Sequence, residues 1–198
     1  MNYLSNCIAD FYVKRNIIEE SDKEVYQAGV SLVLNEALSF ILVVALSWFV
    51  WEIRYSFEFL IVFCITRVFC GGFHAKKTYI CRMTMLTTFV CVIMISSFLG
   101  KFSTEILWLI NLISFLVLLP LIPVKHPNKE LTQELIKVNR KKGVITYILF
   151  GLCSVLVAEY LSVKDGFVMA LSLSAVTVLA IVGTISNERR KKYEKVDK

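Results

Sequence analysis

Two residue types that together perform nucleophilic catalysis stand near each other in this sequence: His74 and Cys81, seven positions apart. An imidazole can take the proton of a thiol, and the thiolate that forms is a strong nucleophile. His74 is one of only 2 histidines in the chain, and it follows the glycine pair Gly71-Gly72 at the edge of an apolar segment. The pattern therefore favours cysteine-based catalysis at a membrane surface, and the alternatives are an interfacial histidine at a helix end for His74 and a core thiol for Cys81.

The spacing of this pair requires the chain to fold back between the two side chains. On one straight helix, positions 74 and 81 would lie about 10.5 Å apart along the axis, whereas a catalytic pair needs heavy atoms about 3 Å apart. Gly71-Gly72 offers a helix break and residues 75–80 a reversal, so a hairpin would bring both side chains to its mouth. The glycine pair has two open interpretations, a helix terminator or a source of free N–H groups for an oxyanion.

The elements that position this pair are predicted to be membrane-spanning helices. Hydrophobic residues make up 57% of the chain, charged residues 19%, and the mean hydropathy is +0.65, which is rare in a soluble domain. Several apolar runs contain the roughly 20 residues that a helix needs to cross a bilayer. The predicted fold is an all-α integral membrane protein with about six transmembrane helices. The expected spans are residues 30–50, 57–74, 83–100, 105–123, 144–162 and 167–185.

We expect a single polytopic membrane domain over residues 1–198, because no polar stretch is long enough for a soluble core. Residues 1–28 are too polar for a cleavable signal peptide, and their pattern predicts an amphipathic helix in the membrane interface. Its apolar face consists of Leu4, Cys7, Ile8, Phe11 and Tyr12. A second helix is expected to begin near residue 22. Residues 30–185 form the transmembrane bundle, and residues 186–198 a basic cytoplasmic tail.

Basic residues are distributed unevenly between the two predicted membrane faces. The N-terminal segment, the loops after spans two and four, and the tail hold 18 Lys and Arg residues, whereas the other loops hold only 3. The positive-inside rule places both termini, His74 and Cys81 in the cytoplasm, where a thiol stays reduced. Because basic loops of this kind are topology signals, nucleic-acid binding is a poor explanation for the net charge of +6.

Two charged residues inside the predicted spans need an explanation. Arg67 is costly in lipid, and three interpretations stay open: its guanidinium reaches the cytoplasmic interface, pairs with Glu36, or binds a substrate carboxylate. Glu36 is an intramembrane acid, which is functional by default, and it is also a candidate to orient His74. Glu58 and Glu159 lie near the opposite ends of their spans and are expected to be solvated.

Other chemistry has weaker support. Cys70, His74 and Cys81 offer three ligands, but their spacing matches no zinc pattern, so we predict no metal and no cofactor. The 6 cysteines do not predict a disulfide framework, since most lie in apolar runs and none shows C-x-x-C spacing. The other histidine, His126, stands in a proline-containing loop and is interpreted as solvated.

The chemistry-bearing segment resembles the accessory gene regulator B (AgrB) family of membrane cysteine endopeptidases from Gram-positive quorum-sensing systems. The matching positions are Arg67, Gly71, Gly72, His74, Ala75 and Cys81. A second match is the loop of residues 123–129, which is similar to the family's proline–asparagine–lysine loop. Glu130 departs from the family pattern, which often has proline there. The resemblance extends over the whole chain, although only the His74/Cys81 segment is highly specific.

The resemblance implies a substrate and a mechanism. The partner would be an AgrD-like precursor peptide with an amphipathic N-terminal helix, a central pheromone segment with a cysteine, and an acidic C-terminal tail. Cys81 would attack the scissile carbonyl and form a thioester, with His74 as the base and later the acid. The cysteine of the peptide would then displace Cys81, which closes a thiolactone or lactone ring. The resemblance also implies a homodimer in the plasma membrane.

Two alternatives remain open at this stage. Lys76, Lys77 and Arg82 would attract an acidic tail and stabilise a thiolate beside them, or they would only set the membrane topology. The protein itself would be either the endopeptidase or a non-enzymatic peptide exporter or sensor partner in the lipid bilayer. Loss of the Cys81 thiol separates these two functions, because an exporter with 6 cysteines should tolerate it.

Overall fold

The computed structural model describes residues 2–50, 52–71, 78–124 and 132–196, and every regular element in them is helical. The elements are α1 (Asn2–Lys14), a short 3-10 turn (Glu20–Asp22), α2 (Lys23–Val50), α3 (Ile53–Cys70), α4 (Thr78–Leu99), α5 (Thr104–Leu118), α6 (Gln133–Tyr160) and α7 (Val163–Val196). Helices α2 to α7 lie at the positions of the six predicted spans, and α2 begins one residue after the expected position 22. The all-α prediction is confirmed.

Four helices are long and apolar enough to cross a membrane within the described residues: α2, α4, α6 and α7. The remaining two are shorter or more polar. Helix α5 has 15 residues, and the 18-residue α3 carries Arg54, Glu58 and Arg67. Large apolar side chains are exposed over the whole surface, as expected where lipid is the solvent. The protein is therefore an all-α membrane protein, and α3, the helix that leads to the chemistry-bearing segment, is not one of these four.

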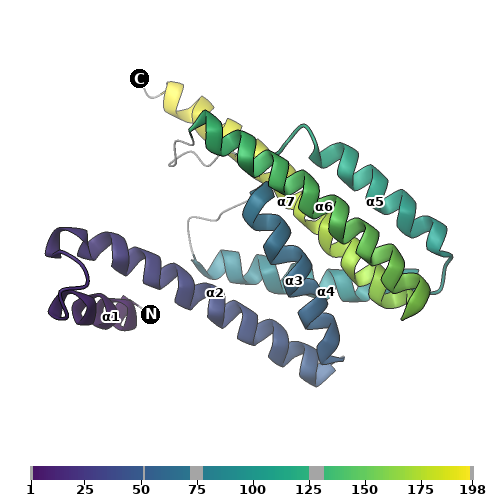
Figure 1. The fold of residues 1–198 in the computed structure, drawn as a ribbon, viewed down its shortest axis with the longest axis horizontal. Coiled ribbons are helices and arrows are strands. Elements are labelled where there is room, and N and C mark those ends of the chain that lie inside the picture. The colour runs from purple at the N-terminus through teal and green to yellow at the C-terminus, as the bar shows by residue number, and fades with distance from the viewer. Residues whose placement is uncertain (1, 51, 72–77, 125–131, 197–198) are drawn as a thin grey trace.

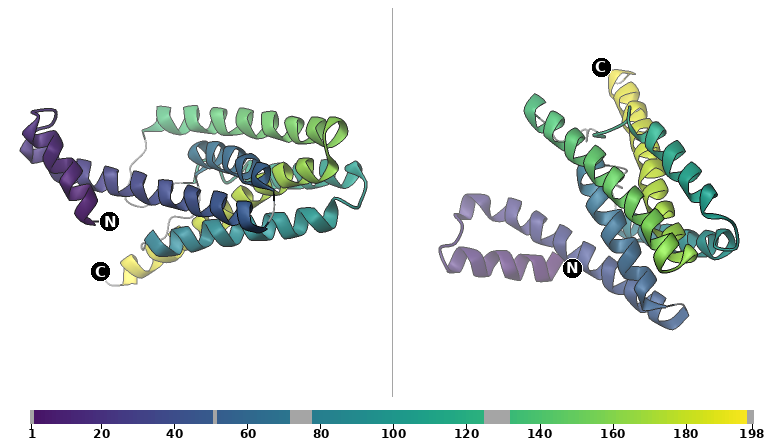
Figure 2. Two further views of the ribbon diagram at one scale, coloured as in Figure 1. Left: turned by 90° about the horizontal axis from the view of Figure 1, so that it is seen from below. Right: turned by 45° about the vertical axis from the view of Figure 1, so that its right-hand side comes forward.

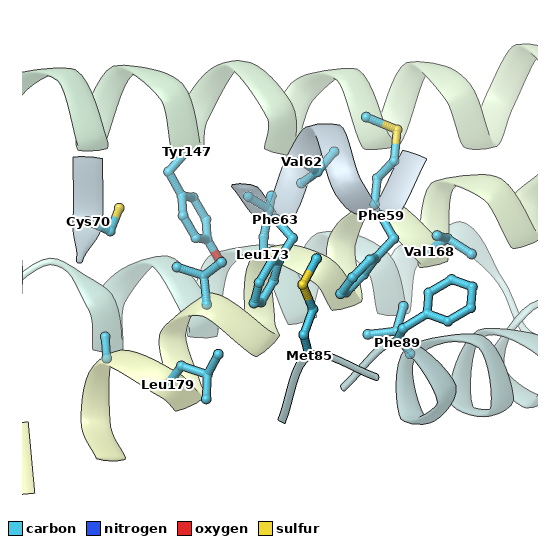
Figure 3. Close-up of a cluster of buried hydrophobic side chains, with 14 of the residues drawn as sticks. Phe59, Val62, Phe63, Cys70, Met85, Phe89, Tyr147, Val168, Leu173 and Leu179 are labelled. Carbon is cyan, nitrogen blue, oxygen red and sulfur yellow. The ribbon is translucent and has the colours of Figure 1, made fainter. Parts of the chain in front are cut away.

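Helix α7 lies at the centre of the bundle, where it packs against α3, α4, α5 and α6 (Figure 1). The main core fills the space between α3, α4, α6 and α7 and is rich in aromatic side chains (Figure 3). Within it, the Phe59 ring stacks on Phe63 with centroids 4.9 Å apart and packs at a tilt on Phe89 at 5.3 Å. Offset and tilted aromatic pairs of this kind add to the stabilisation from burial.

The α1–α2 pair extends away from this bundle, and only the C-terminal half of α2 approaches it (Figures 1 and 2). Helix α1 turns its small residues Ser5 and Ala9 toward α2, so that both are buried. Its larger side chains point outward: Leu4 is 57% and Phe11 51% exposed. This is the amphipathic arrangement that the sequence predicts, since a free apolar face suits the membrane interface.

The α6–α7 hairpin depends on small residues that allow the two helices to approach closely. Gly166 in α7 faces Ser154 and Ala158 of α6, and a Cβ atom at Gly166 would lie 2.5 Å from the Ala158 Cβ. Asn111 of α5 adds a hydrogen bond, because its Nδ2 donates to Ser154 Oγ at 2.9 Å. Small-residue contact and interhelical hydrogen bonds are the usual means of association between membrane helices.

Gly166→Ala is expected to destabilise the fold by about 2 kcal/mol, because the added methyl group must force α6 and α7 apart. The thermal unfolding midpoint in detergent should fall by about 5 °C. Gly29→Ala is the matched control: Gly29 also lies within a helix, but a Cβ atom there would meet nothing within 4 Å. A midpoint that is the same in both variants would contradict the close-packing account.

Candidate active site

Cys81 lies in the first turns of α4 and is half-buried. Its neighbour Arg82 is also half-buried, and the Arg82 Nε atom is buried without a hydrogen-bond partner among the described residues. A guanidinium N–H that is withdrawn from water in this way is available to an anionic or carbonyl oxygen. Cys81 is thus partly exposed, and the residue that follows it carries a buried N–H with no hydrogen-bond partner in the described part of the chain.

The described helices on either side of residues 72–77 are separate elements. Helix α3 ends at Cys70 and α4 begins at Thr78, with Cys81 in the first turns of α4. His74, Gly72, Lys76 and Lys77 lie outside the described residues, and so does His126. The contact between His74 and Cys81 therefore stays a prediction.

Gly71 follows the last residue of α3, at the point where the two segments that resemble the family pattern, residues 67–81 and 123–129, contact each other. Its φ of 75° and ψ of −165° lie in a region that is essentially restricted to glycine. In the second of these segments, the Val124 amide donates a hydrogen bond to the Cys70 carbonyl at 3.0 Å. A Cβ atom on Gly71 would lie 3.0 Å from the Val124 carbonyl oxygen. The predicted second span therefore ends at Cys70 within the described residues, and the loop after α5 packs against its end.

Replacing Gly71 should disturb this junction more than the rest of the fold. Gly71→Ala combines a disfavoured φ with the close approach to Val124, so we expect a stability loss of about 1–3 kcal/mol. Any activity that depends on Cys81 should fall by at least about 10-fold, since small displacements of catalytic groups are costly. Gly151→Ala is the control, because the nearest atom to an added Cβ there is 4.0 Å away. Wild-type activity in Gly71→Ala would show that this backbone junction does not position the site.

Cys70 is fully buried at the same junction. Its sulfur would lie 3.2 Å from a Cβ atom on Gly143 of α6, so the thiol serves to pack α3 against α6. Lys142, the preceding residue, places its Nζ 5.7 Å from the centre of the Phe69 ring. No group of three or more potential metal ligands is present in the part of the chain that the structure describes. Cys70 thus has a structural explanation that involves no metal.

Arg67 lies in the last turn of α3, half-buried, with its guanidinium carbon 5.5 Å from the centre of the Phe63 ring. Glu36 lies in the middle of α2 and is exposed. Glu36 and Arg67 thus lie on two different helices, α2 and α3, that pack against each other. Their pairing, and a role for either one in catalysis, remain predictions.

A charged cluster at the opposite end of the bundle was not predicted from the sequence. Asp165 is 1% exposed, and its Oδ2 lies 3.3 Å from Arg54 Nη1 at the start of α3. Glu58 was expected to be solvated, but it is half-buried, and its Oε2 has no hydrogen-bond partner among the described residues. The prediction for Glu58 was therefore wrong, because α7 packs over this end of α3. The sequence did contain a signal for this cluster, because Arg54 and Asp165 have opposite charges and stand in predicted loops on the same membrane face.

The Arg54–Asp165 pair and the basic residues of α6 lie at opposite ends of the bundle. The first turns of α4 and α6 and the last turns of α7 lie at one end of the molecule (Figure 2, left). Exposed basic residues gather there on the first turns of α6: Lys137, Arg140, Lys141 and Lys142. The Arg54–Asp165 pair lies at the other end, where a Cβ atom on Gly100 would be 3.3 Å from that of Lys164. Cys81 and the basic residues of α6 thus share one end of the bundle.

The profile of the family described as accessory gene regulator B matches residues 5–183, from α1 to the second half of α7. The chain belongs to the accessory gene regulator B family. Membership supports involvement in the processing of the accessory gene regulator pheromone and agrees with the membrane architecture described above. Neither the curated proteins nor the solved structures that were compared include a match to the chain.

Proposed function

We propose that this AgrB protein is a membrane cysteine endopeptidase that removes the C-terminal tail of a pheromone precursor peptide. The observation that carries the proposal is the position of Cys81, half-buried at the start of α4 and next in sequence to Arg82, whose buried Nε has no hydrogen-bond partner among the residues that the structure describes. It lies at the end of the bundle that holds the exposed basic residues of α6. A nucleophile at this position would contact an acidic, membrane-bound peptide at the point where that peptide emerges from the bilayer.

The reaction uses two acyl transfers and no oxidant or external energy source. His74 takes the Cys81 proton, the Cys81 sulfur bonds to the scissile carbonyl carbon, and the C–N bond breaks as His74 returns the proton to the leaving amine. The precursor's own cysteine then attacks the Cys81 thioester and gives its proton back to the Cys81 sulfur. One thioester replaces another, so ring closure is nearly balanced in free energy and needs no ATP. A hydroxyl nucleophile in the precursor would close a lactone instead.

Charge complementarity supports the recognition of an acidic tail. Arg82 and the exposed basic residues on the first turns of α6 lie at the same end as Cys81. Opposite charges speed the encounter and fix the register of a peptide more than they raise its affinity. We propose that this end, together with Lys76 and Lys77, faces the cytoplasm, where the precursor is made.

The amphipathic α1 is proposed to lie on the same leaflet as the helical part of the precursor. Its exposed Leu4 and Phe11 would enter the interface, while Ser5 and Ala9 hold it against α2. This arrangement would concentrate a membrane-bound peptide in two dimensions near the bundle. A homodimer remains an expectation from the family, and the exposed outer face of α2 offers room for a second copy.

Reconstitution of the protein with its precursor peptide in sealed lipid vesicles tests the proposal. Wild-type protein should release the free acidic tail and form the cyclic peptide in the absence of ATP. The alternative function, a peptide exporter or sensor partner, predicts intact precursor at all times and transport that does not depend on Cys81. Intact precursor after long incubation with well-folded wild-type protein would therefore reject the endopeptidase.

A further inference from the structure

A groove between α4 and α7 begins at the turn of α4 that carries Cys81 and continues into the membrane-spanning region. It encloses about 600 Å³ and extends along α4 from Tyr79 to Ile95, a distance of about 24 Å at 1.5 Å per residue. Its walls are mainly apolar. They include Thr87, Thr88 and Cys91 of α4 and Ala175 and Val178 of α7.

The groove and the proposed nucleophile share one face of α4. At about 100° per residue, positions 81, 88 and 92 fall within about 40° of one another around the helix axis. Thr88 and Val92 line the groove, so Cys81, which is not itself a lining residue, lies at the edge of the α4 wall. A peptide whose scissile carbonyl reaches the Cys81 sulfur can therefore continue along the same helix face. Thr88 is about 10.5 Å below Cys81, which three extended residues would span.

The two sides of Cys81 have opposite character. At the end of the bundle where α4 begins lie the exposed basic residues of α6, which suit an acidic chain. Away from that end lies the apolar groove. A single peptide bound across Cys81 would thus have its acidic part at the membrane surface and its apolar part between α4 and α7.

Hydroxyl groups in the groove favour a peptide over a lipid chain as its occupant. Thr84 donates to its own helix at the Ile80 carbonyl, 2.8 Å away. The hydroxyls of Thr87 and Thr88 make no hydrogen bond to any part of the chain that the structure describes, although both residues line the groove. Acyl chains offer these groups no partner, whereas a peptide backbone offers both donors and acceptors.

We propose that the groove is the binding site for the apolar residues that immediately precede the scissile bond, with the third such residue beside Thr88. The inference rests on the proposed function and adds the specificity of that site. It means that the protein selects precursors by the size and apolarity of these residues as well as by the acidity of the tail. Binding there would also hold the acyl group out of water until the ring closes.

Paired precursors that carry leucine or alanine at the third residue before the scissile bond test the groove. Wild-type protein should prefer leucine by about 10-fold or more in kcat/KM. Ala175→Leu fills the groove from α7 and should reduce this preference to near unity. Ala28→Leu, the same substitution at an exposed position of α2, should retain the preference. An unchanged preference in a folded Ala175→Leu protein would overturn the inference.

A second experiment does not depend on the folding of any variant. A precursor with a benzophenone side chain at that third residue should, on irradiation in vesicles, attach to wild-type residues of the groove such as Thr88 or Ala175. Attachment only to phospholipid would show that lipid fills the groove and would overturn the proposal. The same experiment with Cys81→Ser distinguishes a failure of the proposed endopeptidase from a failure of the groove as its binding site. Tail release in that variant rejects the endopeptidase itself, whereas Cys81-dependent release with no groove attachment rejects only the groove.

Discussion

Cys81→Ser should lower the rate of tail release by at least about 10³-fold, because a serine hydroxyl in a site built for a thiol is a poor nucleophile. The reason lies in ionisation: the thiolate is the attacking species, and an imidazole can generate it far more readily than an alkoxide. The protein should otherwise be unchanged, since Cys81 is only half-buried and serine is nearly the same size. Tail release is measured by mass spectrometry of the precursor in proteoliposomes.

Cys153→Ser is the matched control for this variant. Cys153 is half-buried, as Cys81 is, but it lies in α6 and does not line the groove between α4 and α7. It should process the precursor at the wild-type rate, which shows that loss of a half-buried thiol is not harmful in itself. Equal losses in both variants would point to a general effect of thiol loss and would count against a nucleophile at position 81.

His74→Ala should lower the rate by about 10²–10⁴-fold, the usual contribution of a general base. The loss should depend on pH. A thiol ionises without help as the pH rises above neutrality, so the variant should recover part of its rate between about pH 7 and 9 while the wild type changes little. Processing rates across this pH range, with equal amounts of folded protein, provide the measurement.

The histidine outside the predicted site gives a direct comparison. His126→Ala should keep the wild-type rate and pH profile, because the sequence places His126 in a solvated loop. A His74→Ala rate that stays equally low at every pH would argue for a positioning role of His74 and against a general base.

The sequence predicts the helices well because lipid allows few alternatives. Uninterrupted apolar runs can satisfy their backbone in a bilayer only as helices, so α2 to α7 follow from hydropathy alone. Helix ends are less predictable. The second span was expected to continue to residue 74, but α3 ends at Cys70, where Gly71 adopts a positive φ. That conformation depends on the packing of Val124, which is distant in the sequence.

Tertiary contacts account for what the sequence does not reveal. Asp165 reads as part of a polar loop, yet it is buried through its pairing with Arg54 of α3. The groove between α4 and α7 requires two helices whose apolar residues look like any other lipid-facing surface in sequence. Cys81 could be chosen as the candidate nucleophile because its order after the glycine pair and His74 resembles the family pattern. Proximity alone would favour Cys70, which is closer to His74 in the sequence.

Direct detection of the acyl-enzyme is the measurement that tests the account most closely. Wild-type protein is incubated with a precursor whose pheromone cysteine is replaced by alanine, so that the second acyl transfer cannot occur, and its intact mass is then determined. The account predicts a mass increase equal to the precursor without its tail, located at Cys81, removed by hydroxylamine and lacking in Cys81→Ser. Tail release from the normal precursor with no adduct at Cys81 in this trap, or an adduct on another residue, would contradict it.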